Sequence, residues 1–202
     1  GWGLTAPQIA QIIAFCNLSF WLGLLTLGGV LLLTQPMDLS TVLTLPESSV
    51  QSLGVFALAI VGAYLVVSSL MRRSLSVGWL SIPRLSFPVA IAQIIITCID
   101  WAIAATTIYV LLRPTSLHYL PEVIGVYVIA QLAGVLSTVP GGIGIFETVM
   151  ILLLPSVAPK IEIIGALIAF RILHHLLPMG LGVLSLMGYE LHQLLRAKRE
   201  RI

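Results

Sequence analysis

Charged residues are scarce in this chain. Asp, Glu, Lys and Arg make up 9% of its 202 residues, whereas they make up about 25% of a typical soluble domain. Hydrophobic residues reach 58%, and the mean hydropathy is +1.08. The formal net charge of +2 is small and no stretch combines basic and aromatic residues densely, so we expect no nucleic-acid partner. This composition excludes an ordinary soluble domain and indicates a membrane protein.

The chain also lacks the usual signals of metal and cofactor chemistry. Its two cysteines, Cys16 and Cys98, fall inside apolar runs, where a thiol is expected to pack as a small buried hydrophobe. No two histidines have the i, i+4 spacing with an intervening glutamate that marks a metalloprotease. Neither a phosphate-loop lysine nor a dinucleotide fingerprint follows the glycines. We therefore expect no metal, no cofactor and no catalytic residues.

Long apolar runs are what the chain does contain. Because roughly 20 apolar residues cross the hydrocarbon core as a helix, we predict an all-α, polytopic transmembrane helical bundle that forms a single integral-membrane domain over 1–202. The chain begins Gly1-Trp2-Gly3 without a signal-peptide pattern, and we expect a C-terminal fragment of a larger helical membrane domain. The predicted helices lie near 8–33, 51–70, 88–112, 122–138, 144–158 and 162–191.

The distribution of basic residues predicts the orientation of these helices. The connection 34–50 contains no Lys or Arg, whereas the connection 71–87 and the tail 192–202 are basic. Because Lys and Arg favour the cytoplasmic side, we place 71–87 and the C-terminus in the cytoplasm. The connection 71–87 also contains Trp79, and we interpret it as an interfacial segment, either a topology anchor or a lipid-collecting surface. Its arginines are Arg72, Arg73 and Arg84.

Two of the predicted helices are short. The segments 122–138 and 144–158 have about 17 and 15 residues, against roughly 20 for a full crossing. Between them the sequence reads Thr138-Val139-Pro140-Gly141-Gly142-Ile143-Gly144-Ile145-Phe146-Glu147, where a proline and three glycines interrupt the helix. The pair is either two short spans or a re-entrant hairpin with Pro140–Gly144 at its tip. Broken helices often form transporter substrate sites, which favours the re-entrant alternative.

Ionisable residues inside apolar segments are candidates for function, because a charge at membrane depth is costly. Arg171 requires a counter-charge, for which Glu147 and Asp100 are the two candidates. His174 and His175 are adjacent and lie on different helix faces, which argues against their binding one metal. Pro178 lies shortly after them and predicts a kink in the last helix.

Polar and small residues recur at helical spacing in three of the segments. Such stripes indicate either a hydrated interior or interhelical hydrogen bonds through small residues, and the second alternative suffices for Gln93, Thr97 and Thr107. The stripes are Gln93, Thr97, Asp100, Ala104 and Thr107; Tyr127, Gln131, Gly134 and Thr138; and Arg171, His174, Pro178, Gly182 and Ser185.

These residue types together predict a binding site for a charged head group. Glycines at a helix start offer backbone N–H groups, where phosphate binds readily. Arg171 can add a bidentate contact to the same oxygens, while Glu147 and Asp100 suit a cationic group. The predicted substrate-binding residues are Gly141, Gly142, Gly144, Glu147, Arg171, Asp100, Gln131 and His174.

Two motifs in the second half of the chain resemble a known family. Gln131-Leu132-Ala133-Gly134 followed by Pro140-Gly141-Gly142-Ile143-Gly144-Ile145-Phe146-Glu147 resembles the signature of the lysylphosphatidylglycerol synthase transmembrane-region family. Ala169-Phe170-Arg171-Ile172-Leu173-His174-His175-Leu176-Leu177-Pro178, ending in Tyr189-Glu190, resembles that family's final helix, although many relatives carry tyrosines where this chain has His174 and His175. The family includes the flippase half of the multiple peptide resistance factor, which moves aminoacylated phosphatidylglycerol to the outer leaflet.

The resemblance implies a multi-pass protein of the prokaryotic plasma (inner) membrane. We expect a phospholipid flippase or translocation module for aminoacylated or other anionic membrane phospholipids. The sequence contains no aminoacyl-transferase domain, so we expect no synthase activity; a separate lipid-modifying synthase and a second copy of the chain are the protein partners considered. The alternatives are an intramembrane transferase for lipid-linked substrates, an ion-coupled transporter of a small solute, and a scaffold subunit.

Overall fold

The computed structural model describes residues 5–34, 47–70, 75–77, 80–82, 86–114 and 116–199. These residues are helical except for connecting turns and one short hairpin, so the predicted all-α class is confirmed. The main helices are α1 (Ala6–Thr34), α3 (Glu47–Leu70), α4 (Phe87–Leu112), α5 (Leu120–Leu136), α6 (Ile145–Leu153), α7 (Lys160–Arg171) and α8 (Leu177–Arg199). Shorter elements are the 3₁₀ turns η1 (Leu117–Tyr119) and η2 (Pro140–Gly142), the π-helical turn η3 (Ile172–Leu176), and the antiparallel strands β1 (Leu75–Val77) and β2 (Leu80–Ile82).

Five of the described helical segments are long and apolar enough to cross a membrane. They are Ala6–Thr34, Ser49–Leu70, Phe87–Leu112, Leu117–Leu136 and Lys160–Glu190. The sixth predicted segment, 144–158, is shorter than expected, because α6 contains only nine residues. A helix of that length covers about 13.5 Å, which is less than half of a hydrocarbon core roughly 30 Å thick. The length of α6 therefore favours the re-entrant alternative.

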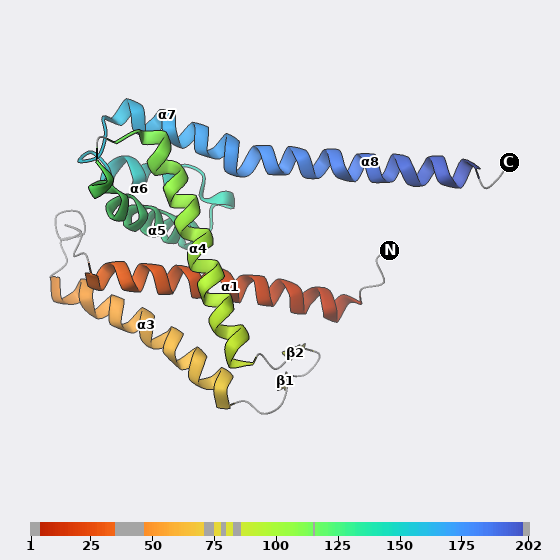
Figure 1. The fold of residues 1–202 in the computed structure, drawn as a ribbon, viewed down its shortest axis with the longest axis horizontal. Helices are drawn as coiled ribbons and strands as arrows, with labels where there is room; N and C mark the ends of the chain where they lie inside the picture. Colours follow the sequence, from red (N-terminus) through yellow and green to blue (C-terminus); the bar gives the residue numbers. More distant parts are fainter. Residues whose placement is uncertain are drawn as a thin grey trace.

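The short pair α5 and α6 lies between α1 and α7 (Figure 1). In that view α1 runs in the opposite direction to the continuous α7–α8 helix, and α4 crosses between them. α1 packs against α3 and α4, α4 packs against α5 and α7, and α5 packs against α6. The main hydrophobic core lies where α4, α5, α6 and α7 meet, and the side chains of Ile108, Val126, Met150 and Phe170 are almost completely buried there. The interrupted segment is thus part of the core.

A polar clamp joins the first three long helices. The Tyr64 hydroxyl donates to Gln93 Oε1 over 2.6 Å, and Gln93 Nε2 donates to Ser19 Oγ over 2.6 Å. Gln93 is therefore an interhelical hydrogen-bonding residue, while Thr97 donates to the Gln93 carbonyl within its own helix. Asp100, from the same predicted stripe, is exposed on α4, so the stripe does not form one buried face.

Replacing Gln93 by Leu should destabilise the contact of α1, α3 and α4. Interhelical hydrogen bonds in membrane proteins contribute on average about 0.6 kcal/mol and at most about 1.7 kcal/mol, and Gln93 makes two of them. We expect a loss of roughly 1 kcal/mol in the free energy of unfolding, measured by reversible denaturation in mixed micelles. Gln8→Leu is the control, because the Gln8 side chain is exposed near the start of α1 and accepts its hydrogen bonds from the neighbouring Thr5. Equal effects of the two changes would contradict the clamp.

The cysteines do not both behave as expected. Cys16 is exposed on α1, so the prediction that it is buried is wrong. Its side chain lies on the half of α1 that extends beyond the packed helices. Cys98 is partly buried, and its thiol lies 3.9 Å from the Gly23 carbonyl oxygen. Neither forms a disulfide.

The turn between α5 and α6 requires glycine. Gly141, Gly142 and Gly144 have φ values of +68°, +60° and +86°, and Thr138 also has a positive φ of 57°. Gly142 lies against α5, where a Cβ atom on it would come within 3.0 Å of the Gly134 Cα. The two glycines let the backbones of the turn and of α5 touch.

Gly142→Ala should therefore destabilise the hairpin. The substitution combines left-handed backbone strain with a backbone clash at Gly134, and we expect a loss of about 1–3 kcal/mol in the free energy of unfolding. Gly165→Ala is the matched control, because a methyl group on Gly165 in α7 would meet no atom within 4 Å. The control should be neutral or slightly stabilising. Thermal denaturation of both variants in micelles, followed by circular dichroism, measures the difference; a neutral Gly142→Ala would contradict the steric requirement for glycine.

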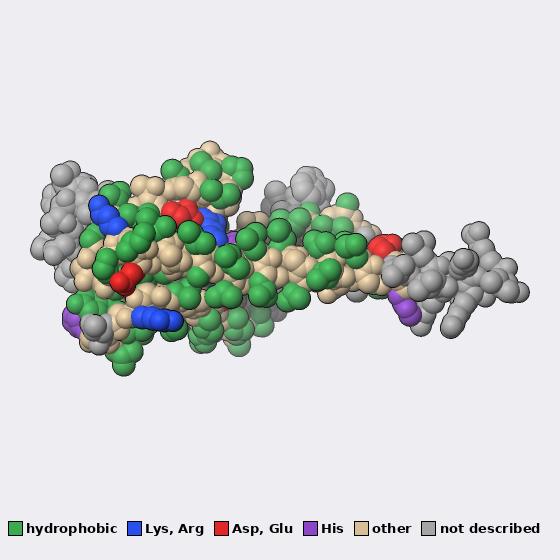
Figure 2. Space-filling model, turned by 90° about the horizontal axis from the view of Figure 1, so that it is seen from above, with side chains coloured by type: hydrophobic (Ala, Val, Ile, Leu, Met, Phe, Trp, Pro, Cys, Tyr) green, Lys and Arg blue, Asp and Glu red, His purple; other side chains and the backbone are tan. Residues whose placement is uncertain are grey.

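The last helix extends away from the core. The side chains of residues 177–190 are all exposed, and in Figure 2 hydrophobic side chains cover this projecting helix along most of its length. Leu181 is 57% exposed and Leu184 is 66% exposed. A helix that is apolar on all sides is typical of a membrane span in contact with lipid or other helices.

Candidate functional site

The start of α6 is capped by a carboxylate of the same helix. Gly144 is the N-cap residue, and its backbone N–H donates to Glu147 Oε2 over 2.7 Å. A carboxylate is favourable there because the first turn of a helix has free N–H groups and the positive end of the helix dipole. Thr148 Oγ1 donates to the Gly144 carbonyl and holds the same turn. The glycine break thus positions Glu147 at the beginning of a short helix.

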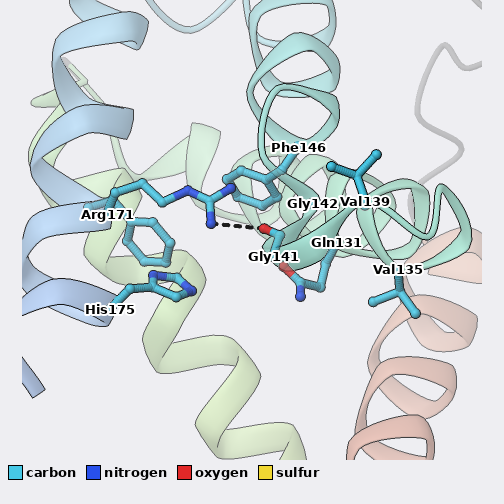
Figure 3. Close-up of a pocket in the computed structure, with 10 residues that line it drawn as sticks. Gln131, Val135, Val139, Gly141, Gly142, Phe146, Arg171 and His175 are labelled. Atoms are coloured by element: carbon cyan, nitrogen blue, oxygen red, sulfur yellow. Dashed lines mark hydrogen bonds between the residues drawn. The ribbon is translucent and has the colours of Figure 1, made fainter. Parts of the chain in front are cut away.

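Arg171, the last residue of α7, binds this turn through every nitrogen of its guanidinium group. Nε donates to Glu147 Oε1 over 2.7 Å, and Nη2 lies 2.7 Å from the same oxygen. Nη1 donates to the Gly141 carbonyl over 3.0 Å (Figure 3). The side chains of Arg171 and Glu147 are 23% and 26% exposed. Of the two predicted counter-charges, the structure pairs Arg171 with Glu147.

The guanidinium group lies at the edge of a small polar pocket. The pocket has a volume of about 170 Å³, and Figure 3 shows Arg171 and His175 pointing toward Gly141 and Gln131 from the opposite wall. The Arg171 Cζ atom lies 5.4 Å from the centre of the Phe146 ring, close enough for a cation–π contact. The lining residues are Gln131, Gly134, Val135, Val139, Gly141, Gly142, Phe146, Phe170, Arg171 and His175.

Aromatic rings form the floor behind this pocket. Tyr127 of α5 contacts Phe146 of α6 and Phe170 of α7 edge to face, with centroid distances of 5.6 and 6.0 Å. On its other side the Tyr127 ring lies 5.9 Å from Trp101 of α4. Because aromatic rings are large and stiff, these contacts fix α4, α5, α6 and α7 relative to one another. The wall that carries Arg171 is therefore held by four helices.

A π-helical turn follows Arg171 directly. The Leu177 N–H bonds to the Ile172 carbonyl, five residues earlier. Pro178 has no N–H group, and its ring crowds the carbonyl of His174. The wide π turn just before Pro178 accommodates the proline at the place where the sequence predicted a kink. A π turn inserts an extra residue into the helix and rotates the next turns about the helix axis. The predicted stripe from Arg171 to Ser185 is interrupted here.

The two histidines of the π turn have different surroundings. His175 lines the pocket, whereas His174 stacks on Phe170 with a centroid distance of 4.9 Å and an angle of 13° between the rings. The sequence pattern pointed to His174, three residues after Arg171. His175, four residues after Arg171, is equally compatible with that helix face, so spacing alone does not choose between the two histidines.

The other predicted site residues fall into three groups. Gln131, Gly141, Gly142 and Arg171 line the pocket together. Glu147 and Gly144 adjoin it through their hydrogen bonds. Asp100 is exposed on α4 and does not line it. The predicted entry arginines Arg72, Arg73 and Arg84 lie outside the described residues.

No arrangement of three or more His, Cys, Asp or Glu side chains within the described ranges is suited to holding a metal ion. The chemistry on offer is a guanidinium group, a carboxylate, an imidazole, an amide and backbone groups of a glycine turn. Such a set can bind and orient charged groups through hydrogen bonds.

Known proteins resemble the chain over its full length and over part of it. No family model matches it. It is 42% identical over 200 residues to the uncharacterized protein slr0712 of Synechocystis sp., covering 99% of this chain and 62% of that protein. It is 28% identical over 201 residues to the inner membrane protein YbhN of Escherichia coli, covering 98% of this chain and 63% of YbhN. The chain thus spans less than two thirds of the length of these two relatives.

A shorter match connects the chain to lipid-modifying proteins. It is 32% identical over 92 residues to a phosphatidylglycerol lysyltransferase of Staphylococcus epidermidis, which is 45% of this chain and 11% of that protein. The chain is homologous to YbhN-like inner membrane proteins. Together with its apolar helices, this makes it a bacterial multi-pass membrane protein.

The ion pair should be energetically coupled across α6 and α7. We expect Glu147→Gln and Arg171→Gln to be non-additive by about 1–3 kcal/mol in a double-mutant cycle, because either single change leaves a partly buried charge without its partner. The free energies of unfolding are measured in mixed micelles. In the control cycle Arg171→Gln is combined with Glu162→Gln, since Glu162 is exposed and nine residues from Arg171 along α7, or roughly 13.5 Å. Equal coupling in both cycles would contradict a specific pair.

Proposed function

We propose that this chain is a phospholipid translocation module of the bacterial inner membrane and acts on aminoacylated or other anionic phospholipids. The observation that carries the proposal is the position of the Arg171 guanidinium group. It has N–H groups left to donate to a ligand, and it lies beside a polar pocket where a membrane helix is interrupted. The contacts with Glu147 and Gly141 occupy one N–H on each nitrogen of Arg171, and each Nη carries a second N–H. Arg171 therefore keeps donors for a ligand while its pair with Glu147 remains intact.

The neighbouring groups suit the parts of such a head group. A phosphodiester would accept hydrogen bonds from the second N–H of each Arg171 Nη, in the planar geometry that guanidinium groups favour for phosphate. The amine of an aminoacyl group would lie next to Glu147 and donate to the Gln131 side-chain oxygen. His175, which lines the pocket beside Arg171, adds a polar contact that can donate or accept.

The comparisons support a lipid of this class. The name of the Staphylococcus epidermidis relative says that it transfers a lysyl group to phosphatidylglycerol, and its match covers 45% of this chain. The name of the YbhN relative places that protein in the inner membrane. Neither name mentions translocation, so that step depends on the pocket at the helix break and on the family resemblance of its motifs.

Translocation can be measured in proteoliposomes that contain the natural full-length protein. Fluorescent aminoacylated, anionic and zwitterionic phospholipids are supplied in one leaflet, and their appearance in the other is followed by chemical quenching. We expect Arg171→Gln to lower translocation of the preferred lipid at least roughly tenfold, since a lost charge-assisted hydrogen bond is worth about 1.5–3 kcal/mol. Glu147→Gln should reduce the preference for aminoacylated over unmodified lipid.

Two matched variants control for charge and folding. Arg113→Gln and Glu162→Gln remove the same charges at exposed positions outside the pocket and should leave translocation unchanged. Translocation that survives Arg171→Gln would overturn the site assignment. A covalently modified lipid product without translocation would favour the intramembrane transferase instead.

A further inference from the structure

A second cavity lies on the other side of the same ion pair. It has a volume of about 400 Å³ and is bounded by Glu147 and Arg171 at its polar end. The rest of its lining is aliphatic and comes from α6, α7 and the π turn. We call it the aliphatic groove; its apolar residues are Ile151, Ile164, Leu167, Ile168, Ile172 and Leu176.

Arg171 lines both cavities, and they differ sharply in chemistry. The polar pocket contains Gln131, His175 and backbone groups of the glycine turn, whereas the groove offers hydrocarbon alone beyond the ion pair. A small soluble solute has no group that matches the groove, and water is poorly held by an apolar surface. An amphiphile matches both sides, because its charged group can meet Arg171 while an attached alkyl chain lies in the groove.

The groove is open along its length. Ile164 is 40%, Ile168 58% and Ile172 48% exposed, while Leu167 is 2% exposed and forms the floor. The residues Ile164, Ile168, Ile172 and Leu176 follow one another at intervals of four and form a row on the helix surface. Twelve residues of helix cover roughly 18 Å. Arg171 lies between Ile168 and Ile172 in the sequence, so the part of the row that runs from the ion pair to Ile164 covers roughly 10.5 Å. One leaflet of a hydrocarbon core accounts for about 15 Å, half of roughly 30 Å, so this part accommodates most of one lipid chain.

We propose that the aliphatic groove holds one acyl chain of the phospholipid whose phosphate contacts Arg171. This inference rests on the proposed function and adds the position of the lipid tail to it. The head group lies in the polar pocket, the phosphate lies at the guanidinium group, and the chain runs from the ion pair along α7 toward Ile164 or along the π turn toward Leu176. The ion pair marks the boundary between the charged and the apolar part of the ligand.

The test uses the natural full-length protein in vesicles and a phosphatidylglycerol probe with a photoreactive diazirine in one acyl chain. After irradiation, mass spectrometry of peptides should find the label on groove residues of α6 and α7. Ile168→Trp fills the groove and should lower this labelling and the translocation of long-chain lipid several-fold. Ile161→Trp is the matched control on the same helix, since Ile161 is 76% exposed and does not line the groove.

A short-chain probe separates this inference from the proposed function. Dihexanoyl phosphatidylglycerol has little tail to place, so its translocation should depend on Arg171 and be insensitive to Ile168→Trp. Translocation of long-chain lipid that requires Arg171 and is unaffected by Ile168→Trp would overturn the groove and leave the function standing. No translocation of either lipid by the unmodified protein would overturn the function itself.

Other occupants give distinct results. A cysteine introduced as Ile168→Cys that forms a disulfide-linked dimer in the membrane, with no lipid label at the groove, would show that a second copy covers it and would overturn the inference. Label spread evenly over the exposed apolar faces of α1, α3 and α8 would show ordinary annular lipid and would overturn it as well.

Discussion

The contact of Arg171 with Glu147 and with the Gly141 carbonyl holds the interrupted part of the fold together. Arg171 lies 24 positions after Glu147 and 30 positions after Gly141 in the sequence. The turn that it binds contains four residues with positive φ. Three of them are glycines, which adopt this conformation readily, whereas Thr138 is in a costly conformation that persists only where surrounding contacts determine it. A guanidinium group suits this task better than an ammonium group, because its planar fork reaches a carboxylate and a carbonyl at once. Without it, the Gly141 carbonyl and Glu147 would both lose a partner at membrane depth.

The same residue marks a change along the last helix. Before Arg171, the side chains of Ile163, Leu167 and Phe170 are buried against α4, α5 and α6; after it, residues 172–190 are exposed. The π turn lies at this boundary. The regular α-helical hydrogen-bond pattern is interrupted there, because Pro178 has no N–H group to donate. Backbone irregularity in membrane helices is tolerated where polar groups or protein can satisfy the freed backbone atoms. The glycine turn and the π turn, two of the irregular segments in the described chain, therefore meet at one ion pair.

Much of this organisation was predictable from the sequence. Hydropathy predicted the helices, because a membrane span needs about 20 apolar residues, and the proline and glycines predicted the break. The cost of an unpaired charge predicted a counter-charge for Arg171 and left Glu147 and Asp100 as its two candidates; the structure pairs Arg171 with Glu147. The positions of His174, His175 and Asp100 were not predictable. Residues three and four positions after Arg171 share its helix face, so spacing does not choose between the two histidines, and the rotation of α4 that leaves Asp100 exposed leaves no periodic signal. The prediction that Cys16 is buried was wrong for a similar reason. An apolar run shows that a residue belongs to a membrane helix, but it does not show which side of that helix packs against protein.

Charge balance constrains which ligands such a site can bind. Arg171 and Glu147 form a neutral pair, which is far cheaper in a low-dielectric environment than either charge alone. An added phosphodiester would give the three groups together a net charge of −1, and the described pocket-lining residues offer no second arginine or lysine to cancel it. A head group with both a phosphate and an amine brings its own compensating charge. Glu147 lies close enough to Arg171 for the phosphate to contact the guanidinium group while the amine contacts the carboxylate. Under the proposed function, the physical cost of transferring charge into a membrane therefore predicts a preference for an aminoacylated lipid over an unmodified anionic one.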